Sequence, residues 1–186
     1  VALTSSNTMT TAQLASMDDI TEGVITATIS DGDLATLASL TNDHTNNALT
    51  VTVTDTAATA AELNTLDTMT SVNVNAAAVV TIEASAVADV KTLITNQVTA
   101  GLDDDYVVTL SDSSIAATDI TTVDTDTTGA VTVSAATITG AHADITTAVS
   151  SSGTSVGAGV ALTSSNTMTS AQLASMDDIT TGVITA

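Results

Sequence analysis

The opening sequence of the chain returns almost unchanged at its end. Residues 1–27 read VALTSSNTMTTAQLASMDDITEGVITA, and residues 160–186 read VALTSSNTMTSAQLASMDDITTGVITA, 159 residues further on. The two copies differ only at Thr11/Ser170 and Glu22/Thr181. A shared fold alone would preserve the hydrophobic pattern and not the choice among Ser, Thr and Asn, so duplication is the simpler origin. We therefore expect residues 1–159 to be one full period of a tandem repeat, with the next period starting at Val160.

Short strand patterns alternate with short helix patterns along this period. Runs typical of strands lie at residues 24–27, 49–54, 72–75, 107–110, 131–134 and 161–163. Thr10 with Gln13, and Thr59 with Glu62, have the spacing of a helix capping box. Four further helices are expected to begin at Asp33, Ser85, Ser114 and Thr139.

These patterns predict an α/β fold, a solenoid of parallel strands joined by short crossover helices. Six strand-helix units of about 26 residues fill one period, and pairs of them form a nested period of about 53 residues. Strands stack about 4.8 Å apart, whereas α-helices pack about 8–10 Å apart. We therefore expect a curved or superhelical array, or helices that are tight and partly 3₁₀. The alternative is a string of tandem all-β Ig-like sandwiches.

Composition narrows the class of partner. The chain has 21 acidic residues and one basic residue, Lys91, which gives a net charge of −20. So negative a surface repels nucleic acid. There is no Cys, which excludes disulfides and thiolate metal sites, and no apolar run approaches the ~18 residues of a membrane span. With no Phe or Trp and only Tyr106, the core must consist of small aliphatic side chains.

Calcium is the one ligand that the motifs indicate. Asp31 and Asp33, and the run Asp103, Asp104 and Asp105, place carboxylates densely in loops, as hard-oxygen sites require. The pair Asp18–Asp19 recurs as Asp177–Asp178 and reads equally well as a solvated helix face. Asp33 also reads as a helix N-cap. The only imidazoles, His44 and His142, lack a second ligand at zinc spacing and are expected to be surface residues.

Three segments resemble repeats of a known family. They are TAAELNTLD at residues 59–67, TTGAVTVSA at residues 127–135 and ITGAHADI at residues 138–145. Their combination resembles the giant Thr/Ala/Asp-rich tandem-repeat cell-surface proteins of marine cyanobacteria. The resemblance spans the whole chain. It implies an extracellular, cell-surface or filamentous role, and it carries over no catalytic residue because that family offers none.

The functional expectation is a structural repeat module rather than an enzyme. Such a module would associate end to end or with neighbouring repeats of the same chain, and so form a filament or surface array. The alternative is an adhesin or phage-type fibre segment whose loops, at residues 42–47, 96–105 and 150–159, bind a receptor or a cell-surface glycan. The equivalent surfaces of the two repeated ends are the expected functional site.

Overall fold

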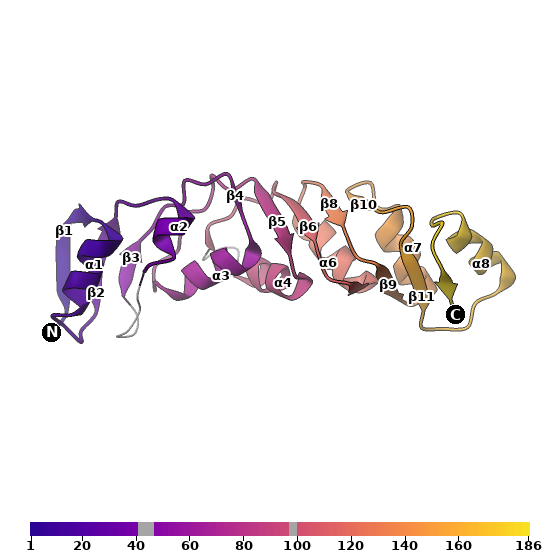
Figure 1. Cartoon of the computed structure of the whole chain (residues 1–186), viewed down its shortest axis with the longest axis horizontal. Helices are drawn as coiled ribbons and strands as arrows, with labels where there is room; N and C mark the ends of the chain where they lie inside the picture. The colour runs from indigo at the N-terminus through magenta and orange to yellow at the C-terminus, as the bar shows by residue number, and fades with distance from the viewer. Residues whose placement is uncertain (41–46, 97–99) are drawn as a thin grey trace. The chain divides into compact units, whose positions relative to one another are not determined.

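Three stretches of the chain are described by the computed structural model, namely residues 1–40, 47–96 and 100–186 (Figure 1). The chain divides into two compact units: unit 1 is residues 1–81 with 95–103, and unit 2 is residues 82–94 with 104–186. Both contain short helices and mostly parallel strands. The α/β class predicted from the sequence is confirmed.

Unit 1 contains a parallel sheet with the strand order β1-β2-β3. Its helices and strands are β1 (Leu3–Met9), α1 (Thr11–Asp18), β2 (Ile25–Ile29), α2 (Leu34–Leu37), β3 (Ala48–Thr50), β4 (Ala57–Ala58) and α3 (Ala60–Thr68). Leu3 faces Ile25, and Thr26 faces Ala48, so each pairing joins residues 22 apart. The strand expected at residues 72–75 is reduced to an isolated bridge between Thr52 and Asn75.

Unit 2 contains two parallel sheets. Its elements are β5 (Thr81–Ser85), α4 (Val87–Thr95), β6 (Val107–Leu110), β7 (Ser114–Ala116), α6 (Ala117–Asp126), β8 (Val131–Val133), β9 (Thr137–Gly140), α7 (His142–Ser150), β10 (Thr154–Val156), β11 (Ala161–Ser164), α8 (Ser170–Asp177) and β12 (Ile184–Thr185). One sheet has the order β10-β8-β6-β5 and the other β12-β11-β9-β7. Val108 faces Val131, which faces Thr154, a step of 23 residues.

Unit 2 has two strands before a helix where the sequence predicted one. β6 and β7 precede α6, and β8 and β9 precede α7. The second strand of each pair carries a single buried aliphatic residue, Ile115 or Ile138, and so has no visible alternation. The strand pairings described step by 22 to 24 residues, which is shorter than the expected average of about 26.

The core consists of aliphatic side chains aligned from strand to strand. Ile115 faces Ile138, and Ile138 faces Leu162, and all three are at most 1% exposed. Full burial of such a side chain contributes about 1.5–3 kcal/mol. A column of this kind replaces the aromatic core that the composition rules out.

The helix starts confirm the local capping rules and correct two of the expected caps. Capping boxes are present at Thr10 and Thr59, and Asp33 caps α2 by accepting from the Thr36 N–H. Ser114 and Thr139 are not caps, because they lie within β7 and β9. The Ser85 prediction is also displaced, since Ser85 ends β5 and α4 begins at Val87. The described helices are α-helical and not partly 3₁₀.

Candidate functional site

Four threonines link segments of the chain that lie about 20 residues apart. Each hydroxyl accepts from the N–H two residues later and donates to an earlier backbone carbonyl. The pairs of threonine and carbonyl are Thr21 with Val1, Thr70 with Leu49, Thr127 with Tyr106 and Thr180 with Val160. We call these the threonine turns. Because one hydroxyl both donates and accepts, a single residue closes the turn and joins it to the preceding segment.

Glycine follows three of these threonines because the turn brings two backbones together. At Gly129, an added Cβ would lie 2.7 Å from the Asp105 carbonyl oxygen, and Gly23 and Gly182 meet backbone just as closely. In the fourth turn, Val72 takes the equivalent place. The Thr-rich turns ending in Gly that the sequence shows are therefore packing contacts between successive segments.

A second set of contacts ties the start of a helix to a side chain further along the chain. The Thr11 N–H donates to Asp31 Oδ2 at 2.7 Å, and the Leu34 N–H donates to Asp55 Oδ2 at 2.7 Å. In unit 2 the same role falls to Asp112 at Val87 and Asn166 at His142, with distances of 2.6 and 3.0 Å. We call these side chains the downstream caps. They satisfy helix N–H groups that have no partner within the helix, and a carboxylate there also interacts favourably with the helix dipole.

Asp31 and Asp33, two of the predicted calcium ligands, each bond to a helix start. Asp31 is the downstream cap of α1, and Asp33 is the N-cap of α2, where its Oδ1 accepts from the Thr36 N–H at 2.9 Å. The hydrogen bonds from Thr36 hold the pKa of Asp33 below its usual value. These bonds account for both residues without a metal ion, as the N-cap reading of Asp33 anticipated.

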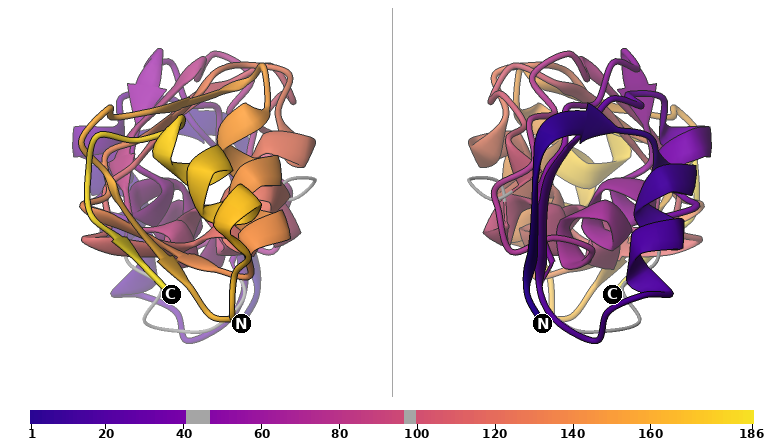
Figure 2. Two further views of the ribbon diagram at one scale, coloured as in Figure 1. Left: turned by 90° about the vertical axis from the view of Figure 1, so that its right-hand side faces the viewer. Right: turned by 90° about the vertical axis from the view of Figure 1, so that its left-hand side faces the viewer.

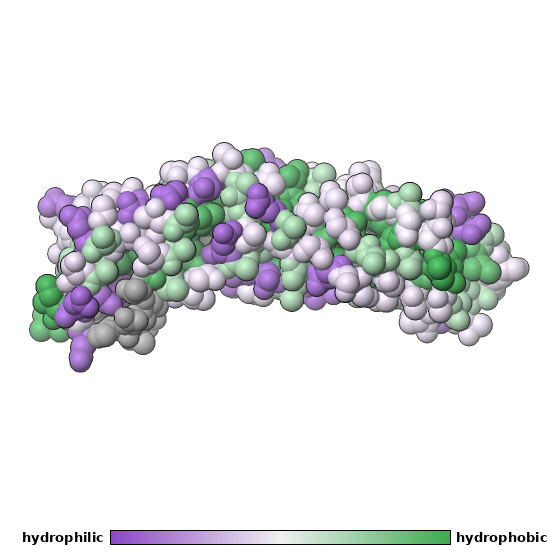
Figure 3. Space-filling view, viewed as in Figure 1, coloured by the Kyte–Doolittle hydropathy of each residue, from purple (hydrophilic) through white to green (hydrophobic). Residues whose placement is uncertain are grey.

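Asp103, Asp104 and Asp105 are all exposed, and the Asp104 carbonyl accepts from the Thr128 N–H at 2.7 Å. In the part of the chain that the structure describes, no group of three or more His, Cys, Asp or Glu side chains could hold a metal ion. Strongly hydrophilic residues appear as separate spots on the face shown in Figure 3. Calcium binding by these aspartates and by Asp31 and Asp33 stays a prediction.

The two histidines do not form a site in the described structure. His44 lies outside the described residues. His142 is the first residue of α7 and is half-buried. Its backbone N–H is capped by Asn166.

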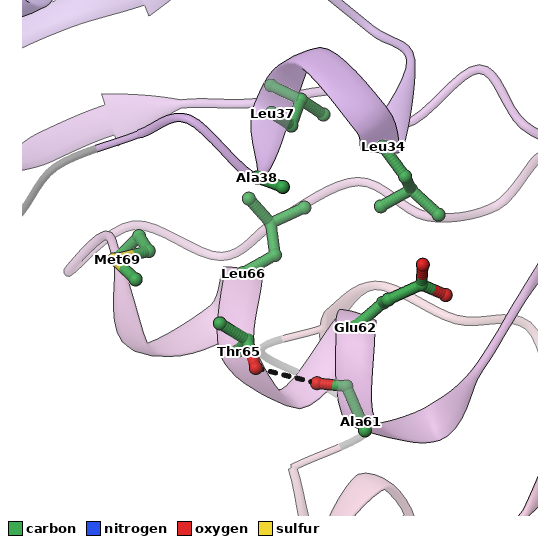
Figure 4. Close-up of a pocket in the computed structure, with 8 residues that line it drawn as sticks. All are labelled: Leu34, Leu37, Ala38, Ala61, Glu62, Thr65, Leu66 and Met69. Atoms are coloured by element: carbon green, nitrogen blue, oxygen red, sulfur yellow. Dashed lines mark hydrogen bonds between the residues drawn. The ribbon is translucent and has the colours of Figure 1, made fainter.

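An apolar groove of about 210 Å³ separates helices α2 and α3 in unit 1. Leu34 and Leu37 descend from α2 towards Leu66, which rises from α3 (Figure 4). Helix α2 is a single turn of four residues, whereas α3 has nine, so α2 leaves part of the facing side of α3 uncovered. Glu62 and Met69 are also among the lining residues.

The two copies of the repeated sequence are buried on opposite sides of the helix. In α1, Leu14 is fully buried and Met17 is half-buried. In α8 the same sequence has its Leu173 side chain 46% exposed and Met176 fully buried. One side of this helix therefore contacts chain that precedes it, and the other side contacts chain that follows it.

Sequence reasoning missed the threonine turns, the downstream caps and the pairing of Tyr106 with Asp126. The buried Tyr106 hydroxyl donates to Asp126 Oδ2 at 2.8 Å, and burial, followed by this hydrogen bond, raises the pKa of Tyr106. The recurring Thr-x-Gly triplet was the available signal for the turns. No comparable signal marks the caps, since other aspartates are equally frequent in the loops.

None of the described helices is long and apolar enough to cross a membrane. The features that distinguish the chain are thus its threonine turns, its downstream caps and the two faces of its repeated helix. No protein-family model, curated protein or solved structure matches this chain.

Proposed function

We propose that this chain is a structural repeat module of a giant extracellular or cell-surface protein, and that its strand-helix units stack as a solenoid into a filament or surface array. The regular parallel pairings support the solenoid, because each joins residues 22 to 24 apart. The threonine turns and downstream caps add contacts between residues 20 to 25 apart. In a solenoid, stability arises mainly from such contacts between neighbouring units.

The opposite burial of the two identical helices is the observation that carries the proposal. A helix at an isolated end needs only one apolar side, yet this sequence carries Leu14 on one side and Met17 on the other. The copies bury Leu14 in one case and Met176 in the other. A sequence suited to contact on both sides is what an internal unit of a stacked array requires.

A structural role is also favoured over a catalytic one. Polar side chains that could carry chemistry, such as Thr127 and Asp31, are hydrogen-bonded to backbone groups of the fold. The net charge of −20 would keep long arrays of small aliphatic residues in solution. Salt would screen the repulsion between neighbouring acidic units, which suits an extracellular medium.

Electron microscopy of chains that contain one, two and four periods tests this proposal. A solenoid should give thin rods that lengthen by about 30 Å with each added period, since each strand step adds about 4.8 Å. Chains of four periods should also join into filaments or sheets at high protein concentration. Globular particles joined like beads would support the Ig-like alternative and refute the solenoid, and rods that never join at any salt concentration would refute the array.

A further inference from the structure

The hollow surface at the C-terminal end of unit 2 consists of residues whose copies in unit 1 are mostly covered. We call it the end face: Ser170, Leu173, Ala174, Asp177, Gly182 and Ile184. Figure 2 shows α8 and β12 in yellow, facing the viewer in the left panel. Leu14 and Ile25, the copies of Leu173 and Ile184, are fully buried. The same sequence thus shows what this surface looks like when it is occupied.

Two chain segments reach the copy of this surface in unit 1, and both supply hydrogen-bond acceptors. The first is residues 28–40, in which Asp31 accepts from the Thr11 N–H at 2.7 Å. The second is residues 47–50, in which the buried Asn47 side chain accepts from the Ile25 N–H at 2.9 Å. In the second segment, Ala48 also pairs with Thr26 as the next parallel strand.

The end face has the same needs. Ser170 is the counterpart of Thr11, and no acceptor for its N–H is described within residues 1–40, 47–96 and 100–186. Leu173 is 46% exposed, and β12 is at the edge of its sheet, where the copy of β3 would pair. An occupant must therefore combine a carboxylate, an amide oxygen, an apolar side chain and a strand.

We propose that the end face binds a further repeat of this chain's own sequence, through the equivalents of residues 28–40 and 47–50. The copy of Asp31 accepts from the Ser170 N–H, and the copy of Asn47 accepts from the Ile184 N–H. The copy of β3 extends the sheet beyond β12. This inference deepens the proposed function, on which it rests, by naming the surface and the partner segment.

The occupant must present these segments uncovered. In an intact second copy of the chain, residues 1–27 already cover residues 28–50 through the contacts of Asp31 and Asn47. The occupant is therefore a repeat that continues after Ala186 and not the N-terminal end of a second intact copy. This distinction makes the inference testable within one molecule.

The test extends the full chain beyond Ala186 by the sequence of residues 28–58. The chain has no cysteine, so Leu173→Cys provides a single thiol whose reaction with a thiol reagent reports the exposure of the end face. We expect the extension to slow this reaction by about tenfold or more, because labelling would then require local opening. Leu14→Cys in the chain without extension provides the buried reference. A matched control extension carries Asp31→Ala, Leu37→Asp and Asn47→Ala in the added segment and should leave the reaction fast.

Amide hydrogen exchange gives a second readout that needs no substitution in the end face. The Ser170 and Ile184 N–H groups should exchange quickly in the chain and slowly after the extension. Protection by both readouts supports the inference even if microscopy finds no filaments, in which case only the proposed array fails. Unchanged labelling and exchange, or equal protection by the control extension, would overturn the inference even where filaments form.

Discussion

Substituting the same leucine in the two copies of the repeat should destabilise the protein by different amounts. Leu14 is fully buried, and a buried Leu→Ala change costs about 2.7–5.0 kcal/mol because it removes apolar contact and leaves a cavity. Leu173 is 46% exposed. About half of the transfer free energy is then absent and no closed cavity forms, so Leu173→Ala should cost about 1 kcal/mol. The local sequence is nearly identical, so the difference of about 2–4 kcal/mol reports the covering chain alone.

Urea titration can measure both costs. Far-UV circular dichroism follows the helices of both units. Fluorescence of Tyr106 follows unit 2, because the chain has no other Tyr and no Trp. The protein concentration should be low and equal for all variants, since association would stabilise the exposed copy. Equal losses for Leu14→Ala and Leu173→Ala would refute the reasoning, because exposure would then not determine the cost.

Three further predictions concern other features. Gly129→Ala should lower stability by about 1–3 kcal/mol, because its Cβ would meet backbone, whereas Gly157→Ala, which faces open space, should have little effect; equal Tyr106 fluorescence midpoints in urea would contradict this. Because hydrogen bonds lower the pKa of Asp33, its cap is fully present at neutral pH and is lost as the pH falls through that lowered pKa. The stability difference between the wild type and Asp33→Ala should therefore shrink on acidification from about pH 7 to about pH 2, and a constant difference would count against the cap. If Asp103, Asp104 and Asp105 bind calcium, EDTA should lower the melting temperature and alanine substitutions should abolish this effect, whereas simple charge screening predicts the same response to sodium at matched ionic strength.

The sequence allowed prediction of the features that depend on near neighbours. The capping boxes at Thr10 and Thr59 follow from a spacing of three residues, and both are present. The strand at residues 107–110 was also recognised, because its aliphatic run is dense. In contrast, the strand at residues 114–116 has one buried aliphatic side chain, Ile115, and no visible alternation.

The features that depend on register could not be predicted. Asp31 and Asp55 become caps only because the parallel pairing places them beside helix starts 20 and 21 residues earlier. No local rule distinguishes them from Asp103, which is exposed. The repeat nevertheless identified its own ends as the candidate site, since identical sequences must present equivalent surfaces. The structure added which side of each copy is covered.

The downstream caps impose an order on folding during synthesis. Helix α1 receives the cap from Asp31 only after that residue has left the ribosome, 20 residues behind Thr11. At about 5–20 residues per second, this corresponds to a delay of roughly 1–4 s. Each helix capped in this way is thus completed by chain that is made after it. The most recently synthesised helix remains the least stable part of the growing protein until its successor arrives.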